Sequence, residues 1–141
     1  MPLWKRQLDL EELRRWQRGT LDETLGIEIL EIGEDFVRGR MPVDGRTRQP
    51  FGLLHGGASV ALAESLGSLA ANLCLEPGSS IAVGLDINAN HLRPVTRGYV
   101  TGTARSLHLG RSTQVWEIRI EDEEGRLCCV ARLTLAVTAK Q

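Results

Sequence analysis

The segment GGASVALAESLGSLAANLCL, residues 56–75, decides the fold, because it predicts one long apolar helix in the middle of the chain. It consists almost wholly of Ala, Leu, Gly and Ser, and its single charged residue is Glu64. At about 100° per residue, four leucines gather opposite Glu64, and we expect this leucine stripe to pack on a sheet. The four are Leu62, Leu66, Leu69 and Leu73.

Strand-like segments stand on both sides of this helix in the sequence. Residues 26–43 predict two short strands with a turn at Gly33–Glu34–Asp35. After the helix, segments rich in Val, Ile, Thr and Leu predict strands at 81–92, 97–108, 112–121 and 127–138. One helix cannot separate four successive strands, so we expect a mostly antiparallel sheet with a helix on one face. This is the α+β class, either as a sheet curled around the helix or as a generic α+β sandwich.

The N-terminal part of the chain predicts short helices. Asp9 and Glu12 form a capping box before a helix at residues 10–18, and Gly19 ends that helix. Thr20 and Glu23 repeat the capping spacing, which predicts a further helical turn. With no linker or repeat, we expect residues 1–141 to form one domain.

Composition and charge exclude several classes of function. The 141 residues are 42% hydrophobic and 25% charged with a formal net charge of −1, so we expect no binding to nucleic acid or to a membrane surface. No apolar run reaches the length of a membrane span, and we expect no signal peptide. Three cysteines, an odd number, favour a reduced cytoplasmic protein, and the His and Cys residues are too scattered for a metal site.

Glu64 stands among small residues on its own helix face. The projection places Gly57, Val60, Ala61, Gly67, Ser68 and Ala71 on that side. Small side chains allow a ligand or another chain to approach closely, whereas exposed helix faces usually carry Lys, Glu and Gln. No Lys or Arg occurs between Arg48 and Arg93, so Glu64 has no basic partner on its helix. The alternative is that Glu64 lies on a solvent-exposed outer face.

The start of the long helix is a candidate site for a carbonyl group. Free N–H groups and the helix dipole attract negative charge there, and Gly56 and Gly57 leave the backbone uncovered. Such a site polarises a carbonyl or holds an oxyanion, although two glycines also suit a tight turn. His55, just before them, is a base, an orienting group or a loop residue. No G-x-S-x-G nucleophile motif is present, so a hydrolase triad is not expected.

Two later segments combine histidine and arginine at expected strand ends. They are VGLDINANHLRPVTRG, residues 83–98, and SLHLGRSTQ, residues 106–114. Arg and Ser beside a backbone turn suit phosphate groups, and a solvated hairpin tip is the alternative.

Four motifs together resemble a known family. QPFGLLHGGASVALAES, INANHLRP and HLGRSTQVWEI, with DEEGRLCCVARLT at the end, are similar to the hot-dog acyl-CoA thioesterases of the phenylacetate and 4-hydroxybenzoyl-CoA type. The resemblance is strongest to the branches concerned with 1,4-dihydroxy-2-naphthoyl-CoA and with proofreading in enterobactin synthesis. It implies a curled antiparallel sheet wrapped around one long central helix.

The resemblance also implies roles for matched residues. Glu64 would be the catalytic carboxylate, as nucleophile or as general base on water. Gly56 would polarise the thioester carbonyl through its N–H, with Gln49 and His55 near that carbonyl. Ser68, one turn after Glu64, would position the carboxylate or its water. Coenzyme A would contact Val83, Asn90, His91 and Arg93, and the turn His108, Gly110, Arg111 and Ser112.

By the same resemblance, the substrate is an aromatic acyl-CoA, no metal or redox cofactor is needed, and the active sites lie between subunits of a dimer of dimers. Menaquinone synthesis, siderophore proofreading and aromatic catabolism are the candidate pathways. Two alternatives are a hot-dog dehydratase or isomerase acting on acyl thioesters, and a non-catalytic acyl-CoA binding module. The chemical product distinguishes them, since hydrolysis releases a free thiol.

Overall fold

The computed structural model describes residues 3–139 of the chain. Three helices and six strands follow one another along it. The N-terminal helices are α1 (Leu10–Gln17) and α2 (Leu21–Leu25), and the long helix is α3 (Gly56–Leu73). The strands are β1 (Glu28–Ile32), β2 (Phe36–Pro42), β3 (Ser80–His91), β4 (Tyr99–Leu109), β5 (Thr113–Glu121) and β6 (Leu127–Ala139).

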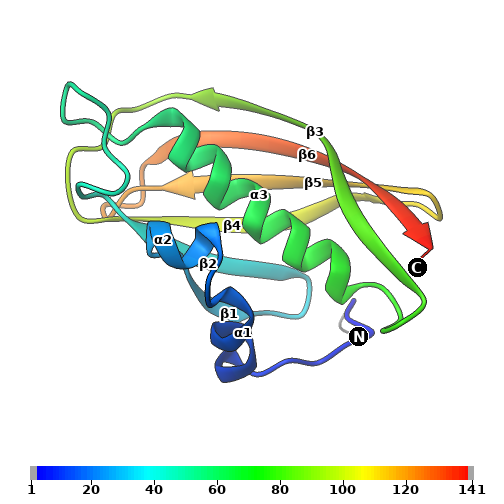
Figure 1. Cartoon of the computed structure of the whole chain (residues 1–141). Coiled ribbons are helices and arrows are strands. Elements are labelled where there is room, and N and C mark those ends of the chain that lie inside the picture. The colour runs from blue at the N-terminus through cyan, green and yellow to red at the C-terminus, as the bar shows by residue number, and fades with distance from the viewer. Residues whose placement is uncertain (1–2, 140–141) are drawn as a thin grey trace.

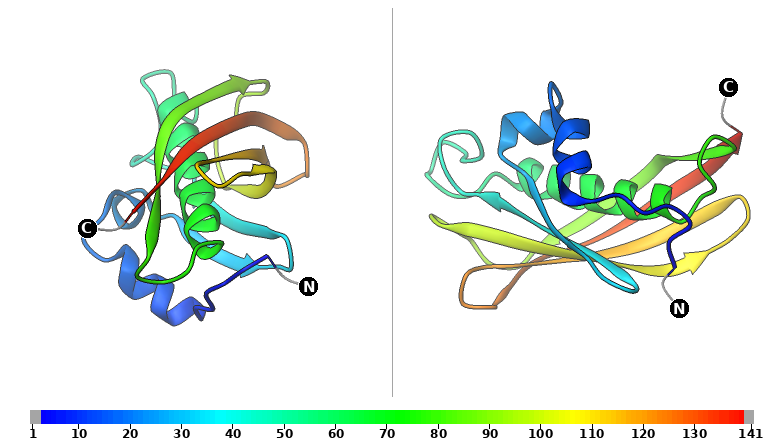
Figure 2. Two further views of the ribbon diagram at one scale, coloured as in Figure 1. Left: turned by 90° about the vertical axis from the view of Figure 1, so that its right-hand side faces the viewer. Right: turned by 90° about the horizontal axis from the view of Figure 1, so that it is seen from below.

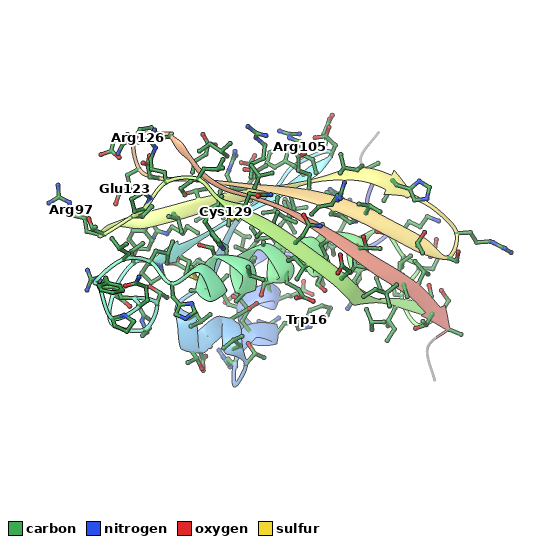
Figure 3. The ribbon with its side chains drawn as sticks, turned by 90° about the horizontal axis from the view of Figure 1, so that it is seen from above. Trp16, Arg97, Arg105, Glu123, Arg126 and Cys129 are labelled. Carbon is green, nitrogen blue, oxygen red and sulfur yellow. The ribbon has the colours of Figure 1, made fainter. Side chains whose placement is uncertain are left out.

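All six strands form one antiparallel sheet in the order β1-β2-β4-β5-β6-β3. The sheet curls around α3, which crosses its concave face (Figures 1 and 2). Helices α1 and α2 lie on the side of α3 that faces away from the sheet (Figure 3). The curled sheet and long central helix that the sequence predicts are therefore confirmed.

Glycines allow α3 to approach the sheet closely. Gly39 and Gly102 are paired across β2 and β4, and the Leu66 side chain lies over both. A Cβ on Gly39 or Gly102 would come within 2.7 or 2.8 Å of a Leu66 methyl carbon. Leu66 itself is fully buried, so this leucine of α3 fills a hollow in the sheet.

The two edges of the sheet differ in length and in charge. Edge strand β1 has five residues, two of them glutamates that pair with arginines of β2. Edge strand β3 has twelve residues with the sequence SIAVGLDINANH, and its exposed apolar side chains include Val83 and Leu85. A long edge that exposes apolar side chains and lacks Lys and Arg can add a strand of another chain, whereas a short charged edge resists such pairing.

The predicted element boundaries agree with the structure to within two residues. Asp9 caps α1 by accepting a hydrogen bond from the Glu12 N–H, and Gly19 and Gly26 follow α1 and α2 with positive φ angles. The turn at Gly33 joins β1 to β2 as predicted. Helix α3 ends at Leu73, two residues before its predicted end.

Candidate active site

The first turn of α3 leaves one backbone N–H free. His55 caps the helix, and its Nδ1 accepts the Gly57 N–H at 2.8 Å. Gly57 is therefore not open to a ligand, contrary to the expectation that both glycines expose their backbone. Within residues 3–139, the Gly56 N–H has no acceptor. The local structure thus leaves Gly56 to bind an external oxygen, with His55 as its organising cap.

Gly56 opens into a cavity of about 350 Å³. The His91 imidazole lies against Gly56, so that a Cβ on this glycine would come within 2.9 Å of His91 Nε2. Arg93 and Gln49 line the same cavity. The structure thus brings together four residues that the sequence analysis placed in two separate groups.

Gln49 holds the loop that precedes α3. Its Oε1 accepts the Phe51 N–H at 2.5 Å and lies 3.4 Å from the Leu53 nitrogen. Its backbone also bonds to Leu53 and Gly52. The carboxamide N–H groups have no protein acceptor within residues 3–139, so they remain available at the cavity.

Glu64 lies in the middle of α3 and faces edge strand β3. Its Oε2 occupies the space beside Gly84, where a Cβ would collide with it. Gly84 adjoins an irregularity in the β3–β6 register between Gly84 and Asp86. The half-buried Glu64 carboxylate makes no hydrogen bond or ion pair within residues 3–139. It is thus an unpartnered carboxylate at a strand edge, not an exposed charge on an outer helix face.

The small residues near Glu64 serve two purposes, which corrects the expectation that they all admit a ligand. Gly67 and Ala71 are buried, and a Cβ on Gly67 would come within 2.7 Å of the Leu133 side chain. On this part of the helix face, the small residues therefore allow the sheet to pack closely against α3. Leu69, predicted to pack on the sheet, is instead only partly buried and lines a second cavity. The helical projection is correct about the direction of each side chain around α3, but it does not identify which element packs against that side chain.

The second cavity, of about 330 Å³, lies between α3 and the pair α1–α2. Ser65 and Ser68, which follow Glu64 on α3 by one and four residues, line it. Most of its other wall is apolar, from Leu13, Trp16, Leu21, Ile29 and Leu69. Trp16 is labelled in Figure 3 on the side of α3 that faces away from the sheet.

The predicted coenzyme A contacts fall into two groups within one chain. Thr113 pairs with Ala136, and Ala136 pairs with Val83, so the His108–Ser112 turn lies near Val83. Asn90 and His91 lie at the opposite end of β3, and Arg93 follows two residues after the strand ends. Eight residues of strand separate Val83 from His91, about 26 Å at 3.3 Å per residue.

Asn72 bonds to the edge strand just before Gly84. Its carboxamide donates to the Ala82 carbonyl at 3.1 Å and accepts the Ala82 N–H at 2.9 Å. These bonds close the outer backbone edge at Ala82. The free part of the edge therefore runs from Gly84 to His91, because Leu92 already bonds to Cys128.

Cys128 lines the Gly56 cavity, but it is a poor nucleophile. Burial raises the pKa of its thiol to about 11, and the thiol donates to the Ile120 carbonyl at 3.2 Å. Burial likewise raises the pKa of Cys74 to about 11. Both thiols are neutral near pH 7, and the thiolate is the reactive form of cysteine. The three cysteines are free.

Two further findings concern metal ligands and membrane-spanning helices. Nowhere in residues 3–139 do three His, Cys, Asp or Glu side chains gather as metal ligands would. None of the helices in that range combines the length and apolar character needed to cross a membrane.

Sequence reasoning missed three residues of the site: Gly84, Asn72 and Asp22. Asp22, on α2, bonds to Ser65 across the second cavity. No motif marks these residues, because each matters through a contact between elements that are distant in sequence. A glycine within a strand was the one available signal, since it often marks a bulge or a close approach.

Comparison with known proteins shows the same family throughout. A model of the thioesterase superfamily matches residues 51–129. The 1,4-dihydroxy-2-naphthoyl-CoA hydrolase of Escherichia coli is 54% identical over 135 residues, which are 96% of this chain and 98% of that protein. The proofreading thioesterase EntH of Cronobacter turicensis has the same identity and coverage. The crystal structure of thioesterase HI1161 from Haemophilus influenzae is 58% identical and superposes with a TM-score of 0.95, covering 97% of this chain and 95% of that one.

Proposed function

Since this chain belongs to the thioesterase superfamily, we propose that it hydrolyses aromatic acyl-CoA thioesters to the free acid and coenzyme A, with Glu64 as the catalytic carboxylate. The resemblance noted from the sequence is confirmed at the level of family and fold. The aromatic acyl group is supported by the name of one relative, a 1,4-dihydroxy-2-naphthoyl-CoA hydrolase, and the name of the other, a proofreading thioesterase, supports thioester hydrolysis. The observation that carries the role of Glu64 is its unpartnered carboxylate beside Gly84.

Hydrolysis needs an attacking oxygen and a group that stabilises the carbonyl oxygen. Glu64 either removes a proton from the attacking water or attacks the carbonyl carbon itself, forming an anhydride that water then opens. In both routes the carbonyl oxygen gains negative charge as the new C–O bond forms, and the Gly56 N–H donates to it. The C–S bond then breaks, and the coenzyme A thiolate leaves and takes up a proton.

One chain cannot supply both groups to one carbonyl. Gly56 and Glu64 are eight residues apart on the same helix, which corresponds to about 12 Å at 1.5 Å per residue. An oxyanion donor and an attacking oxygen must each lie about 3 Å from the reacting carbonyl group. The site therefore combines Glu64 and Ser68 of one chain with Gly56, Gln49 and His55 of a second chain.

The open edge of β3 offers a way to pair the two chains. If its free part, residues 84–91, pairs antiparallel with the same residues of a second copy, Gly84 lies opposite the second copy's His91. Glu64 adjoins Gly84, and Gly56 adjoins His91, so the two catalytic halves meet at this point. The same pairing brings Val83 and its neighbouring His108–Ser112 turn next to Asn90, His91 and Arg93 of the other chain. All of the predicted coenzyme A contacts then share one location, within the dimer of dimers that the resemblance implies.

The cavity between α3 and α1–α2 suits the acyl group. Ser65 and Ser68 bring it beside Glu64, and its walls are largely apolar. An aromatic ring there would contact Trp16 and Leu69. We place the reaction in the cytoplasm, because all three cysteines are free, and without a metal or redox cofactor, because the carboxylate and the N–H suffice for the chemistry.

Mixed dimers test the shared site directly. Two inactive variants, Glu64→Ala and Gln49→Ala, are co-expressed with different affinity tags, and the mixed species is purified. If each site is shared between two chains, every mixed dimer contains one site in which Glu64 and Gln49 are both intact and one in which both are replaced. The mixed species should then recover about half of the wild-type rate. No recovery would show that Glu64 and Gln49 act within one chain.

Release of free thiol from a panel that includes benzoyl-CoA and 1,4-dihydroxy-2-naphthoyl-CoA tests hydrolysis itself. An altered acyl chain with an intact thioester would instead indicate a dehydratase or isomerase.

A further inference from the structure

The cavity between α3 and α1–α2 contains a carboxylate in an otherwise mainly apolar wall. Asp22, at the start of α2, is half-buried and lines this cavity. The Ser65 hydroxyl donates to Asp22 Oδ1, and the Gln17 carboxamide donates to Oδ2 at 3.3 Å. Gln17 is itself held in place, since its Nε2 also donates to the Ile27 carbonyl at 3.2 Å. No Lys or Arg within residues 3–139 forms an ion pair with Asp22.

The two observed donors do not exhaust the capacity of this carboxylate. An ionised carboxylate only accepts hydrogen bonds, and its two oxygens offer about four acceptor positions. Ser65 and Gln17 occupy two of them. About two acceptor positions therefore remain for water of hydration or for a ligand. An acyl group that enters the cavity displaces this water, so the ligand itself must supply a donor or leave a charged oxygen poorly solvated.

We propose that Asp22 selects aromatic acyl groups that carry a ring hydroxyl, by accepting a hydrogen bond from that hydroxyl. This inference rests on the proposed function, because it requires the acyl group to occupy this cavity. Asp22 is then a specificity residue that touches the substrate far from the reacting carbonyl. Its negative charge also disfavours acyl groups that carry a free carboxylate.

The size of the effect follows from the cost of an unmatched polar group. A site built to bind a substrate hydroxyl rejects the analogue that lacks it, because the buried acceptor is left without a partner. A hydrogen bond to a charged group corresponds to a preference of about ten- to a hundred-fold in kcat/KM. Wild-type protein should show this preference for at least one of the three monohydroxybenzoyl-CoA isomers over benzoyl-CoA.

The test compares kcat/KM for benzoyl-CoA and the three monohydroxybenzoyl-CoA isomers in wild type, Asp22→Leu and Asp22→Asn. Asp22→Leu should bring the ratio of kcat/KM for hydroxybenzoyl-CoA to kcat/KM for benzoyl-CoA close to one. It should also raise kcat/KM for benzoyl-CoA, because the cavity wall becomes apolar. Asp22→Asn keeps the shape and the bond from Ser65, and should give an intermediate preference. The matched control is Glu23→Gln, which alters a neighbouring acid of α2 that does not line the cavity, and it should keep the wild-type preference.

The outcomes separate this inference from the proposed function. If Asp22 only ties α2 to α3, its variants lower the rates of all four substrates equally, and an unchanged preference overturns the inference while hydrolysis stands. Asp22→Asn provides the same comparison should Asp22→Leu not fold. Wild-type protein that hydrolyses neither these thioesters nor 1,4-dihydroxy-2-naphthoyl-CoA would overturn the proposed function and the inference together.

Discussion

The Glu64 carboxylate fills the space that a side chain on Gly84 would need. The absence of a Cβ on this strand residue therefore determines where the carboxylate can lie. Because Gly84 is also the first free residue of the β3 edge, the same contact places Glu64 beside the open part of that edge.

Replacing Gly84 by alanine should displace Glu64 without removing it. A displacement of about 1 Å in a catalytic group costs on the order of 100-fold in rate, so we expect kcat to fall between ten- and a hundred-fold. Steady-state release of coenzyme A measures this, with circular dichroism to verify the fold. Gly45→Ala is the matched control, since a Cβ there meets nothing within 4 Å. An unchanged kcat in Gly84→Ala would show that the observed position of Glu64 is not the reactive one.

Glu64→Gln should lower kcat by about 10² to 10⁴, because an amide is neither a base nor an effective nucleophile here. The variant should keep its thermal stability, since Glu64 makes no hydrogen bond or ion pair within residues 3–139 that the change would break. Single-turnover kinetics and a thermal melt give both quantities. A loss smaller than ten-fold would contradict the assigned role.

Cys128 lies in the Gly56 cavity and is the obvious rival nucleophile, but its raised pKa, about 11, argues against that role. At pH 8 a thiol with a pKa of 11 is about a hundred-fold less ionised than one with a pKa of 9, and its alkylation is slower in proportion. We therefore expect slow reaction with iodoacetamide at pH 8, with a rate that rises toward pH 11. Rapid labelling of Cys128 that abolishes activity at pH 7 would show that the thiol takes part in the reaction.

Arg93→Ala should raise KM more than it lowers kcat, because a phosphate contact binds the ground state and the transition state alike. Arg111→Ala should do the same if the two chains pair as proposed, although the two arginines lie at opposite ends of one chain's sheet. Arg119→Ala is the control, since Arg119 is an exposed β5 residue whose nearest acid is 3.8 Å away. A KM change in Arg93→Ala alone would contradict the pairing, whereas wild-type KM in both variants would remove them from the site.

Gly67→Ala should destabilise the protein by about 1 kcal/mol or more, because overpacking a core costs more than the gain in helix propensity. The new methyl group would come within 2.7 Å of the fully buried Leu133 side chain. Urea denaturation measures the loss. A more stable variant would mean that Leu133 can move aside at low cost.

Much of this architecture can be predicted from local sequence signals. Asp9, Gly19, Gly26 and Gly33 stand at element boundaries, where a cap or a turn has a recognisable residue type. These signals depend on a few neighbouring residues, which is why the elements agree closely with the structure.

The site could be predicted only in part, because its decisive contacts join distant elements. A helical projection places Gly67 near Glu64, but it cannot show that the sheet already covers Gly67. It also cannot show that Asn72 reaches Ala82, or that Asp22 reaches Ser65. The family resemblance places Gly56 and Glu64 in one active site, although they are eight residues apart on α3. The proposed pairing with a second chain is needed to bring two such residues to one substrate.

The unequal edges of the sheet bear on how many copies can join. A sheet with two open edges adds copies without end, as in fibres. If two copies pair through β3 as proposed, they use up both of their open edges and leave only the short, charged β1 strands outside. Growth of the sheet through its edges therefore stops at two chains.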